Sequence, residues 1–355
     1  MKTTLLNSVV VTVMAAATVS AQSAPAKIDV TRLGPQVGQR VAAFDLTDQA
    51  GARRTLESVM GPNGVMLVFS RSADWCPYCK TQLVELQSRL PELKKKGLGL
   101  AAITYDSPAI LADFSRRRGI TFPLLSDAGS ATIKAFGLLN TTVDPASTNF
   151  GIPFPGTFIV NRQGIVTARF FEEAYQERNT VSSILLKLGE RGSRINATKL
   201  TTDHVEITTY LSDQAVAPGT VFSIVADISP RSGMHVYAPG KHSYKVVAFR
   251  LDEQPFLITR PLRYPASEIY EFKPLKERVE VYQKPFTVAL DVAFDGSATA
   301  RKALASRETM TITGALEYQA CNDRICFLPQ SLPVTYTVTM RQLDTERANT
   351  GKTAP

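Results

Sequence analysis

Four cysteines are the residues of this 355-residue chain with the clearest capacity for chemistry, and they fall as two close pairs. Cys76 and Cys79 are separated by two residues, and Cys321 and Cys326 by four. A disulfide that closes so short a loop restricts the unfolded chain little and therefore stabilises the fold little. A chain of this length also buries enough apolar surface to fold without such bridges. The spacing therefore favours reversible thiol–disulfide chemistry at both pairs.

The first pair lies in the segment WCPYC at 75–79, between an apolar run and the start of a predicted helix. At a helix start, free backbone N–H groups and the positive end of the dipole stabilise the thiolate of Cys76. Cys79 follows one turn later and can resolve a mixed disulfide. The motif thus predicts Cys76 as the attacking thiol, exposed and of lowered pKa, and Cys79 as the resolving thiol. A zinc half-site or an inert bridge is the alternative, although no second Cys/His pair has zinc spacing.

Hydrophobic periodicity predicts two domains of different class. Residues 37–190 alternate strand-like and helix-like stretches, which indicates an α/β sheet with helices on its faces. Helical spacing then disappears and strand-like segments recur between turn signals, which predicts an all-β sandwich of immunoglobulin type over 199–341. We expect residues 191–198 to form a short polar linker that acts as a hinge. Residues 342–355 are polar and are expected to be a disordered tail.

The N-terminal segment has the features of a secretory signal. Lys2 precedes an apolar stretch, and the small residues Val19 and Ala21 predict cleavage before Gln22, which removes residues 1–21. An uncleaved membrane anchor is the alternative, and no later window has the length of a transmembrane span. We therefore expect a secreted or periplasmic mature chain, in an oxidising compartment, with no transmembrane segment.

Composition and charge exclude some classes of protein. Apolar residues make up 44% of the chain, which excludes wholesale disorder. Lys and Arg exceed Asp and Glu by 40 to 32, a net charge of +8. The basic runs at 94–96 and 116–118 end predicted helices, where cations are favourable. The charge is therefore no indication of nucleic-acid binding.

The first domain resembles the thioredoxin-like redoxins, the branch shared by AhpC/TSA peroxiredoxins and TlpA-type reductases. The resemblance covers about residues 37–190 and rests on WCPYC, the apolar run before it, and the stretch GIPFPGTFIV at 151–160. In that family a proline before the Thr-Phe strand is cis and lies against the active-site disulfide. The resemblance implies this role for Pro155, with Pro153 as the weaker candidate, and so a cis bond that faces the Cys76–Cys79 loop.

Two features depart from the patterns of that family. Peroxiredoxins carry a Pro and a Thr upstream of the peroxidatic cysteine, where this chain has Phe69 and Ala73. The buried acid that many thioredoxins place on the strand before the motif is absent from residues 65–70, and we expect Asp74 to be exposed. A thiol peroxidase acting through Cys76 is therefore an alternative rather than the leading hypothesis.

The second domain resembles the N-terminal periplasmic domain of the thiol:disulfide interchange protein DsbD. The resemblance covers about 197–341 and rests on YQAC at 318–321 followed by Cys326. It implies an immunoglobulin-like domain with a redox cysteine pair, shielded by an aromatic cap loop for which Tyr264 is the candidate. A disulfide on a hairpin edge has no helix dipole to stabilise a thiolate, so it should act as substrate and carrier. A bridge that only fixes the hairpin is the alternative.

Together these features predict a secreted thiol–disulfide oxidoreductase with a fused carrier domain. The second pair would exchange electrons with the first pair or with an outside partner. We expect protein thiols or disulfides and an upstream electron donor as partners, and no cofactor, metal ion or nucleic acid. A copper-handling module is the alternative from another class, but it needs a distant His, and residues 37–190 contain none. We interpret His235 and His242 as ordinary surface or strand residues, because neither has ligand spacing from a cysteine.

Overall fold

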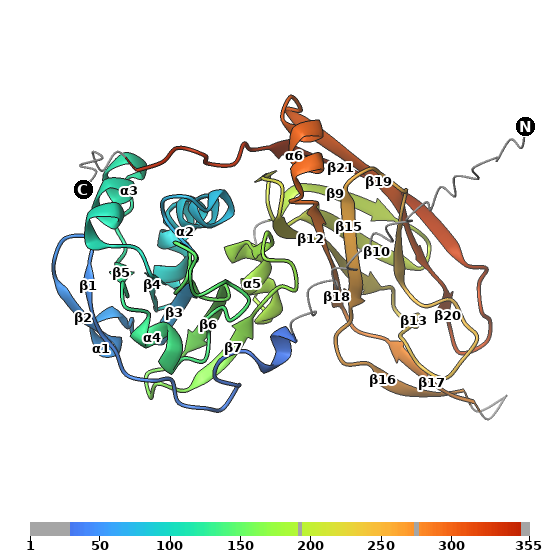
Figure 1. Ribbon diagram of the computed structural model, residues 1–355. Helices are drawn as coiled ribbons and strands as arrows, with labels where there is room; N and C mark the ends of the chain where they lie inside the picture. The colour runs from blue at the N-terminus through green and yellow to red at the C-terminus, as the bar shows by residue number, and fades with distance from the viewer. Residues whose placement is uncertain (1–28, 191–193, 273–276, 349–355) are drawn as a thin grey trace, which may run out of the picture.

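The computed structural model describes residues 29–190, 194–272 and 277–348 (Figure 1). The predicted signal segment, residues 1–21, lies outside this part of the chain. Within it, no helix combines the length and the apolar character needed to cross a membrane.

The first domain is built on a seven-stranded mixed sheet in the order β2-β1-β5-β4-β3-β6-β7. β4 pairs in parallel with β3 and β5, whereas β3 pairs antiparallel with β6. The prediction of an α/β sheet covered by helices is confirmed. Its elements are a 3-10 helix (Val30–Arg32), β1 (Asp45–Asp48), β2 (Arg53–Thr55), α1 (Leu56–Val59), β3 (Gly64–Phe69), α2 (Pro77–Lys95), β4 (Leu98–Thr104), α3 (Pro108–Arg118), β5 (Leu124–Ser126), α4 (Ala131–Ala135), β6 (Gly156–Val160), β7 (Val166–Phe170), β8 (Arg178–Asn179) and α5 (Val181–Lys187).

The central strand β3 serves two apolar cores, because successive side chains of a strand point to opposite faces. All six of its residues are buried. Met66 and Val68 pack with apolar residues of α2, α3 and α5. Leu67 and Phe69 pack on the other face, with α1 and α4. The apolar stripe of α2 holds that helix on the sheet and so places its N-terminus beyond the end of β3.

The second domain is a β-sandwich, as the sequence predicts. One sheet has the order β15-β18-β12-β10-β9 and the other β11-β21-β19-β14, and a third, small sheet, β16-β17-β13-β20, carries Cys321. One apolar core includes Phe222 of β12 and Ile312 of β19. The elements are β9 (Ile195–Thr201), β10 (Val205–Leu211), β11 (Ala215–Val216), β12 (Thr220–Pro230), β13 (His235–Tyr237), β14 (Ala248–Leu251), β15 (Leu257–Arg263), β16 (Glu268–Phe272), β17 (Glu277–Tyr282), β18 (Phe286–Phe294), α6 (Ala298–Leu304), β19 (Thr309–Tyr318), β20 (Ala320–Cys321) and β21 (Gln330–Met340).

The two domains are joined by main-chain and side-chain contacts. Strand β8 of the first domain pairs in parallel with β12 of the second. Lys187 of α5 lies 3.0 Å from Asp291 of β18, and Leu186 packs against the sandwich. Residues 191–193 lie outside the described part of the chain. The expected linker is wrong for residues 195–198, because they begin β9, which pairs with β10.

The chain returns to the first domain after β21. It leaves the sandwich and runs across to the neighbourhood of α3, near the C-terminus marked in Figure 1. We call residues 343–348 the strap. The predicted disordered tail is wrong for residues 342–348, because their side chains find partners on both domains that composition alone does not reveal. Residues 349–355 lie outside the described part.

Candidate active site

The first cysteine pair lies at the N-terminus of α2, just beyond the end of β3. Cys76 is the N-cap residue and Pro77 is the first residue of the helix. The backbone N–H of Cys79 donates to Sγ of Cys76 at 3.3 Å, and the two residues form a disulfide. Cys76 therefore stands at the helix start that the sequence predicts, where free N–H groups and the dipole favour a thiolate.

Both cysteines of this pair are buried. Cys76 is 1% exposed and Cys79 is 0% exposed. They pack together with Tyr78, and Trp75 and the strap residue Leu343 close the cluster from outside. The expectation that Cys76 presents an exposed sulfur is therefore wrong. Trp75 and Tyr78 belong to the motif itself, whereas Leu343 comes from the far end of the chain, so the motif contains no sign of that second cover.

A buried carboxylate holds the loop that leads into the motif. Asp106 accepts hydrogen bonds from the backbone N–H of Ala73 at 2.6 Å and from the hydroxyls of Ser72 and Thr104 at 2.9 and 2.7 Å. Burial raises the pKa of Asp106, against the effect of these hydrogen bonds. The strand before the motif carries no acid, and the sequence gives no sign of Asp106 as its counterpart, because this residue follows β4 and reaches the loop only through the fold.

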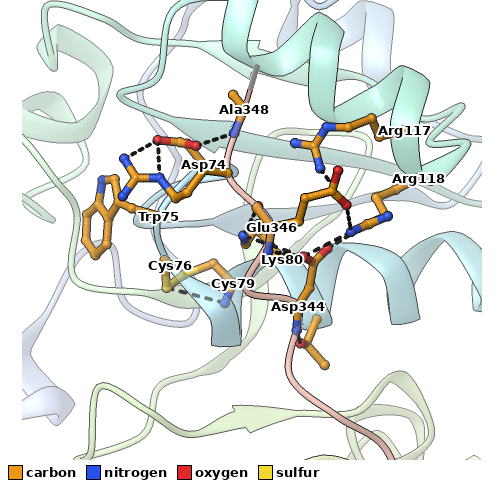
Figure 2. A network of polar contacts seen from close by, with 12 residues as sticks. Asp74, Trp75, Cys76, Cys79, Lys80, Arg117, Arg118, Asp344, Glu346 and Ala348 are labelled. Atoms are coloured by element: carbon orange, nitrogen blue, oxygen red, sulfur yellow. Dashed lines mark hydrogen bonds and ion pairs between the residues drawn. A yellow bond between two sulfur atoms is a disulfide. The ribbon is translucent and has the colours of Figure 1, made fainter. Parts of the chain in front are cut away.

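Asp74, which we expected to be exposed, is buried under the strap. Its carboxylate accepts hydrogen bonds from the guanidinium of Arg347, at 2.8 Å from Nε, and from the backbone N–H of Ala348 at 2.6 Å. Burial alone would raise the pKa of Asp74, but these hydrogen bonds and the charges of Arg347 and Lys80 outweigh it, so its pKa is lowered. Asp74 is therefore a charged anchor for the strap (Figure 2).

A buried arginine contacts the second sulfur of the pair. The Arg178 guanidinium donates to Sγ of Cys79 at 3.2 Å and to the backbone carbonyls of Tyr175 and Glu177 at 2.7 and 2.6 Å. Burial, followed by the charge of Arg71, lowers the pKa of Arg178 to about 9, which leaves it cationic at neutral pH. Sequence reasoning missed Arg178, because an isolated Arg in an irregular stretch carries no motif.

The second cysteine pair joins β20 to the hairpin tip that follows it. Cys321 is buried and Cys326 is exposed, and the two form a disulfide. The hydroxyl of Tyr237 lies 3.0 Å from Sγ of Cys321 and 3.4 Å from Sγ of Cys326. Ile325 and Leu328, two large apolar side chains beside Cys326, are exposed as well. Of the two sulfur-bearing residues, Cys326 is the one open to another molecule.

Tyrosines other than the predicted one shield this pair. The ring of Tyr237 stacks on that of Tyr244 with centroids 4.1 Å apart, and a small cavity beside the disulfide is lined by both rings and by Tyr270. Tyr264 instead packs against the main sandwich core and donates its hydroxyl to the carbonyl of Val247 at 2.6 Å. The assignment of Tyr264 as the cap is therefore wrong, because this residue follows β15 and packs against the large core rather than beside the disulfide.

Two histidines belong to the surroundings of the second pair. His235 is a buried strand residue whose backbone pairs with that of Cys321, and burial lowers its pKa to about 4. Nε2 of His242 lies 2.8 Å from the carbonyl of Ala238. Over the residues that the structure describes, no group of three or more His, Cys, Asp or Glu side chains is arranged to hold a metal ion.

Comparison with known proteins decides the family of the first domain. The profile of the AhpC/TSA family matches residues 37–169. Alkyl hydroperoxide reductase E of Mycobacterium tuberculosis is 34% identical over 138 residues, which are 38% of this chain and 84% of that protein. The chain belongs to the AhpC/TSA family.

A second family profile matches the sandwich domain, and further relatives match the first domain. The profile of the N-terminal domain of the thiol:disulfide interchange protein DsbD matches residues 208–337. The thiol-disulfide oxidoreductase ResA of Bacillus cereus is 26% identical over 144 residues, 40% of this chain and 74% of that protein. The solved structure of peroxidoxin BcpB from Mycobacterium tuberculosis is 25% identical, covers 40% of this chain and 89% of that chain, and has a TM-score of 0.36. The predicted fusion of the two families is confirmed, and the relatives support an oxidoreductase.

The predicted cis bond at Pro155 of the AhpC/TSA domain is wrong. The described residues contain no cis peptide bond. Pro153 forms an isolated antiparallel β-bridge with Leu139, and the backbone N–H of Phe154 donates to the Leu138 carbonyl at 2.7 Å. Strand β6 begins at residue 156. The chain is thus held extended on both sides of Pro155, and X–Pro bonds favour trans where no tight turn requires cis.

The positions that peroxiredoxins fill with Pro and Thr have structural roles here. Phe69 is a fully buried core residue at the end of β3. Ala73 lies in the loop before the motif, where its N–H bonds to Asp106 and its side chain has no hydroxyl to offer. The nearby hydroxyl of Ser72 accepts the N–H of Asp74 at 2.9 Å and donates to Asp106, so it already has partners.

The two cysteine pairs of this AhpC/TSA protein lie in separate surroundings. Trp75, Tyr78 and Leu343 pack around the first pair, whereas the second pair lies among tyrosines of the small sheet. Figure 1 shows β20 on the side of the sandwich away from α2. Strand β8 pairs with β12, and in the domain arrangement that this pairing fixes, Sγ of Cys76 does not lie at the Cys321–Cys326 pair.

Proposed function

We propose that this protein is a secreted or periplasmic thiol–disulfide oxidoreductase that reacts through Cys76 and Cys79. The observation that carries the proposal is the pair itself. One sulfur caps a helix N-terminus and the other accepts a hydrogen bond from the buried guanidinium of Arg178. Both features stabilise thiolates, which are the reactive species of disulfide exchange.

The exchange proceeds in two displacements. In the reduced protein, the thiolate of Cys76 attacks one sulfur of a substrate disulfide, forms a mixed disulfide and releases the other sulfur as a thiolate. The thiolate of Cys79 then attacks Sγ of Cys76 and releases the second substrate thiolate. The substrate gains two electrons and the Cys76–Cys79 disulfide is restored. The reverse sequence oxidises a dithiol partner.

The second pair serves as a carrier for a separate partner. An incoming thiolate reaches Cys326 because that residue is exposed, and attack there releases the thiolate of Cys321 beside the hydroxyl of Tyr237. The exposed side chains of Ile325 and Leu328 flank the entry point. The match to the DsbD N-terminal domain supports thiol-based electron transfer at this pair.

A redox titration of the full chain against glutathione buffers tests both assignments. Variants with Cys76→Ser and Cys79→Ser, or with Cys321→Ser and Cys326→Ser, isolate each pair. We expect each pair to titrate as a reversible two-electron couple. A pair that stays oxidised below about −300 mV is a structural bridge and contradicts its assignment. N-terminal sequencing of the exported protein tests the location, with Gln22 as the expected first residue.

Peroxide reduction through Cys76 is the second candidate, because alkyl hydroperoxide reductase E is among the relatives. In that reaction the thiolate of Cys76 attacks the peroxide oxygen, becomes a sulfenic acid and releases an alcohol or water. Cys79 then condenses with the sulfenic acid to give the disulfide and water. A peroxide-consumption assay tests this activity, and a Cys76→Ser variant, which lacks the thiol that both reactions need, shows whether the consumption depends on Cys76. Consumption at a rate above that of disulfide exchange would favour the peroxidase.

A further inference from the structure

The strap binds to the AhpC/TSA domain directly beside the active-site disulfide. Leu343 packs against the cluster of Cys76 and Cys79, and the backbone N–H of Asp344 donates to the hydroxyl of Thr81 at 3.2 Å. Figure 2 shows the strap passing the two cysteines and continuing toward Asp74. Cys76 is 1% exposed while the strap lies in this place, and Leu343 is one of the side chains that pack around it.

Three cations hold the acidic side chains of the strap. We call Lys80, Arg117 and Arg118 the cationic site. Asp344 accepts hydrogen bonds from Arg118 at 2.6 and 3.1 Å and lies 3.5 Å from the ammonium of Lys80. The carboxylate of Glu346 lies 3.3 Å from Arg117 and also pairs with Arg118. The cationic site thus binds the carboxylates of Asp344 and Glu346, which are two positions apart in the strap.

Lys80 shows that this site is built for an anion. Its side chain is 0% exposed, and the hydrogen bond that its ammonium donates goes to the backbone carbonyl of Glu346. A buried ammonium is costly unless it is paired. Both the carbonyl and the nearby carboxylate of Asp344 come from the strap, so the bound strap supplies these two partners of the Lys80 ammonium.

We propose that the cationic site is a docking site for an extended acidic segment of the substrate polypeptide, and that the strap occupies it as an internal competitor. The proposal rests on the oxidoreductase function proposed above. A substrate cysteine at the place of Leu343 packs against the cluster that contains Cys76 and Cys79, and acidic residues one and three positions later meet the partners of Asp344 and Glu346. The preferred substrate is therefore an acidic segment of the pattern Cys-acid-x-acid.

The first experiment measures the cover. Asp344→Lys and Glu346→Lys in one full chain place like charges against the cationic site and should release the strap. In the reduced protein, we expect iodoacetamide to label Cys76 about tenfold faster than in the unchanged chain. Asp203→Lys with Glu253→Lys changes the net charge equally at exposed positions of the sandwich and should leave the rate unchanged. If Cys76 is labelled at the same rate in the strap variant and in the unchanged chain, the strap does not limit access to Cys76.

The second experiment measures docking in the strap variant. The substrates are two synthetic peptides, Gly-Cys-Asp-Thr-Glu-Arg and Gly-Cys-Asn-Thr-Gln-Arg, each as its mixed disulfide with glutathione. The pre-reduced enzyme reduces each peptide in a single turnover and ends with its own disulfide. We expect a preference of about tenfold for the acidic peptide. Adding Arg118→Gln should abolish the preference, whereas Arg116→Gln, whose guanidinium pairs with Asp113 on the same helix, should retain it.

The outcomes separate the docking proposal from the function beneath it. If both peptides are reduced at equal rates, the docking site is wrong and the oxidoreductase function stands. If neither peptide is reduced by any variant, the oxidoreductase function itself is wrong. If the preference persists after Arg118→Gln, the acidic peptide binds elsewhere and the cationic site is excluded as its docking site.

Discussion

The guanidinium of Arg178 donates a hydrogen bond to Sγ of Cys79 at 3.2 Å, and it does so from a strand that the second domain holds in place. Arg178 opens β8, which pairs with β12 of the sandwich. A cation at this distance favours the thiolate form of Cys79 and hence the reduced pair. The pairing of β8 with β12 of the sandwich therefore helps to position the cation that contacts Cys79.

Replacing this arginine should make the first pair a weaker oxidant. Arg178→Met removes a charged hydrogen bond to the reduced form, a contribution of about 1.5–3 kcal/mol. Since about 1.4 kcal/mol corresponds to about 30 mV, the reduction potential should fall by roughly 30–60 mV. Redox titration of the first pair measures the shift. In Arg178→Lys, which keeps the charge, the reduction potential should fall by less than in Arg178→Met. An unchanged potential in a folded Arg178→Met variant would show that the contact does not tune the pair.

A matched experiment applies to the second pair. Tyr237→Phe removes the hydroxyl beside Cys321 and Cys326, and burial keeps that hydroxyl protonated because it raises the pKa of Tyr237. Loss of a neutral hydrogen bond of about 0.5–1.5 kcal/mol should lower the potential of this pair by roughly 10–30 mV. Tyr282→Phe is the control, since its hydroxyl donates to the carbonyl of Pro265. Equal shifts in the two variants would refute a direct effect on the sulfurs.

Glu85 should make stability depend on pH. Burial, followed by the like charge of Asp213, raises its pKa to about 8, against about 4.3 in the unfolded chain. The folded state therefore binds more protons between these values, and stability falls as pH rises through that window. Glu85→Gln should remove this pH dependence. The free energy of unfolding of the variant should therefore rise relative to that of the unchanged protein by up to about 1.4 kcal/mol per pH unit within the window. Urea unfolding at pH 5 and pH 8 measures it. Parallel stability curves for the two proteins would contradict the raised pKa.

The separation of the two pairs predicts the fate of a trapped intermediate. In a Cys79→Ser variant, a mixed disulfide at Cys76 has no resolving thiol. Because β8 and β12 tie the domains together, we expect Cys76 to link to other proteins or to glutathione rather than to Cys321 or Cys326. Mass spectrometry of a non-reducing digest identifies the partner. An intrachain link between Cys76 and the second pair would establish a direct relay and a movement of the domains.

The sequence by itself determined the two domain classes and the two close cysteine pairs, which form disulfides in the structure. The apolar run of β3 and the three- and four-residue spacing in α2 are local patterns, and local patterns are what hydrophobic periodicity records. The placement of Cys76 at a helix start follows from the same patterns. The match of each segment to its family agrees with this reading.

Only the tertiary structure decided what surrounds the sulfurs. Arg178, Leu343 and Tyr237 reach the cysteines from segments far along the chain, and no spacing rule connects them. The same limit explains Tyr264, an aromatic residue that packs against a different core. Exposure and pKa depend on the sum of such distant contacts, because burial and neighbouring charge act through space rather than along the sequence. Leu343 is the clearest case, because it packs against the cluster of Cys76 only through the return of the end of the chain to α2.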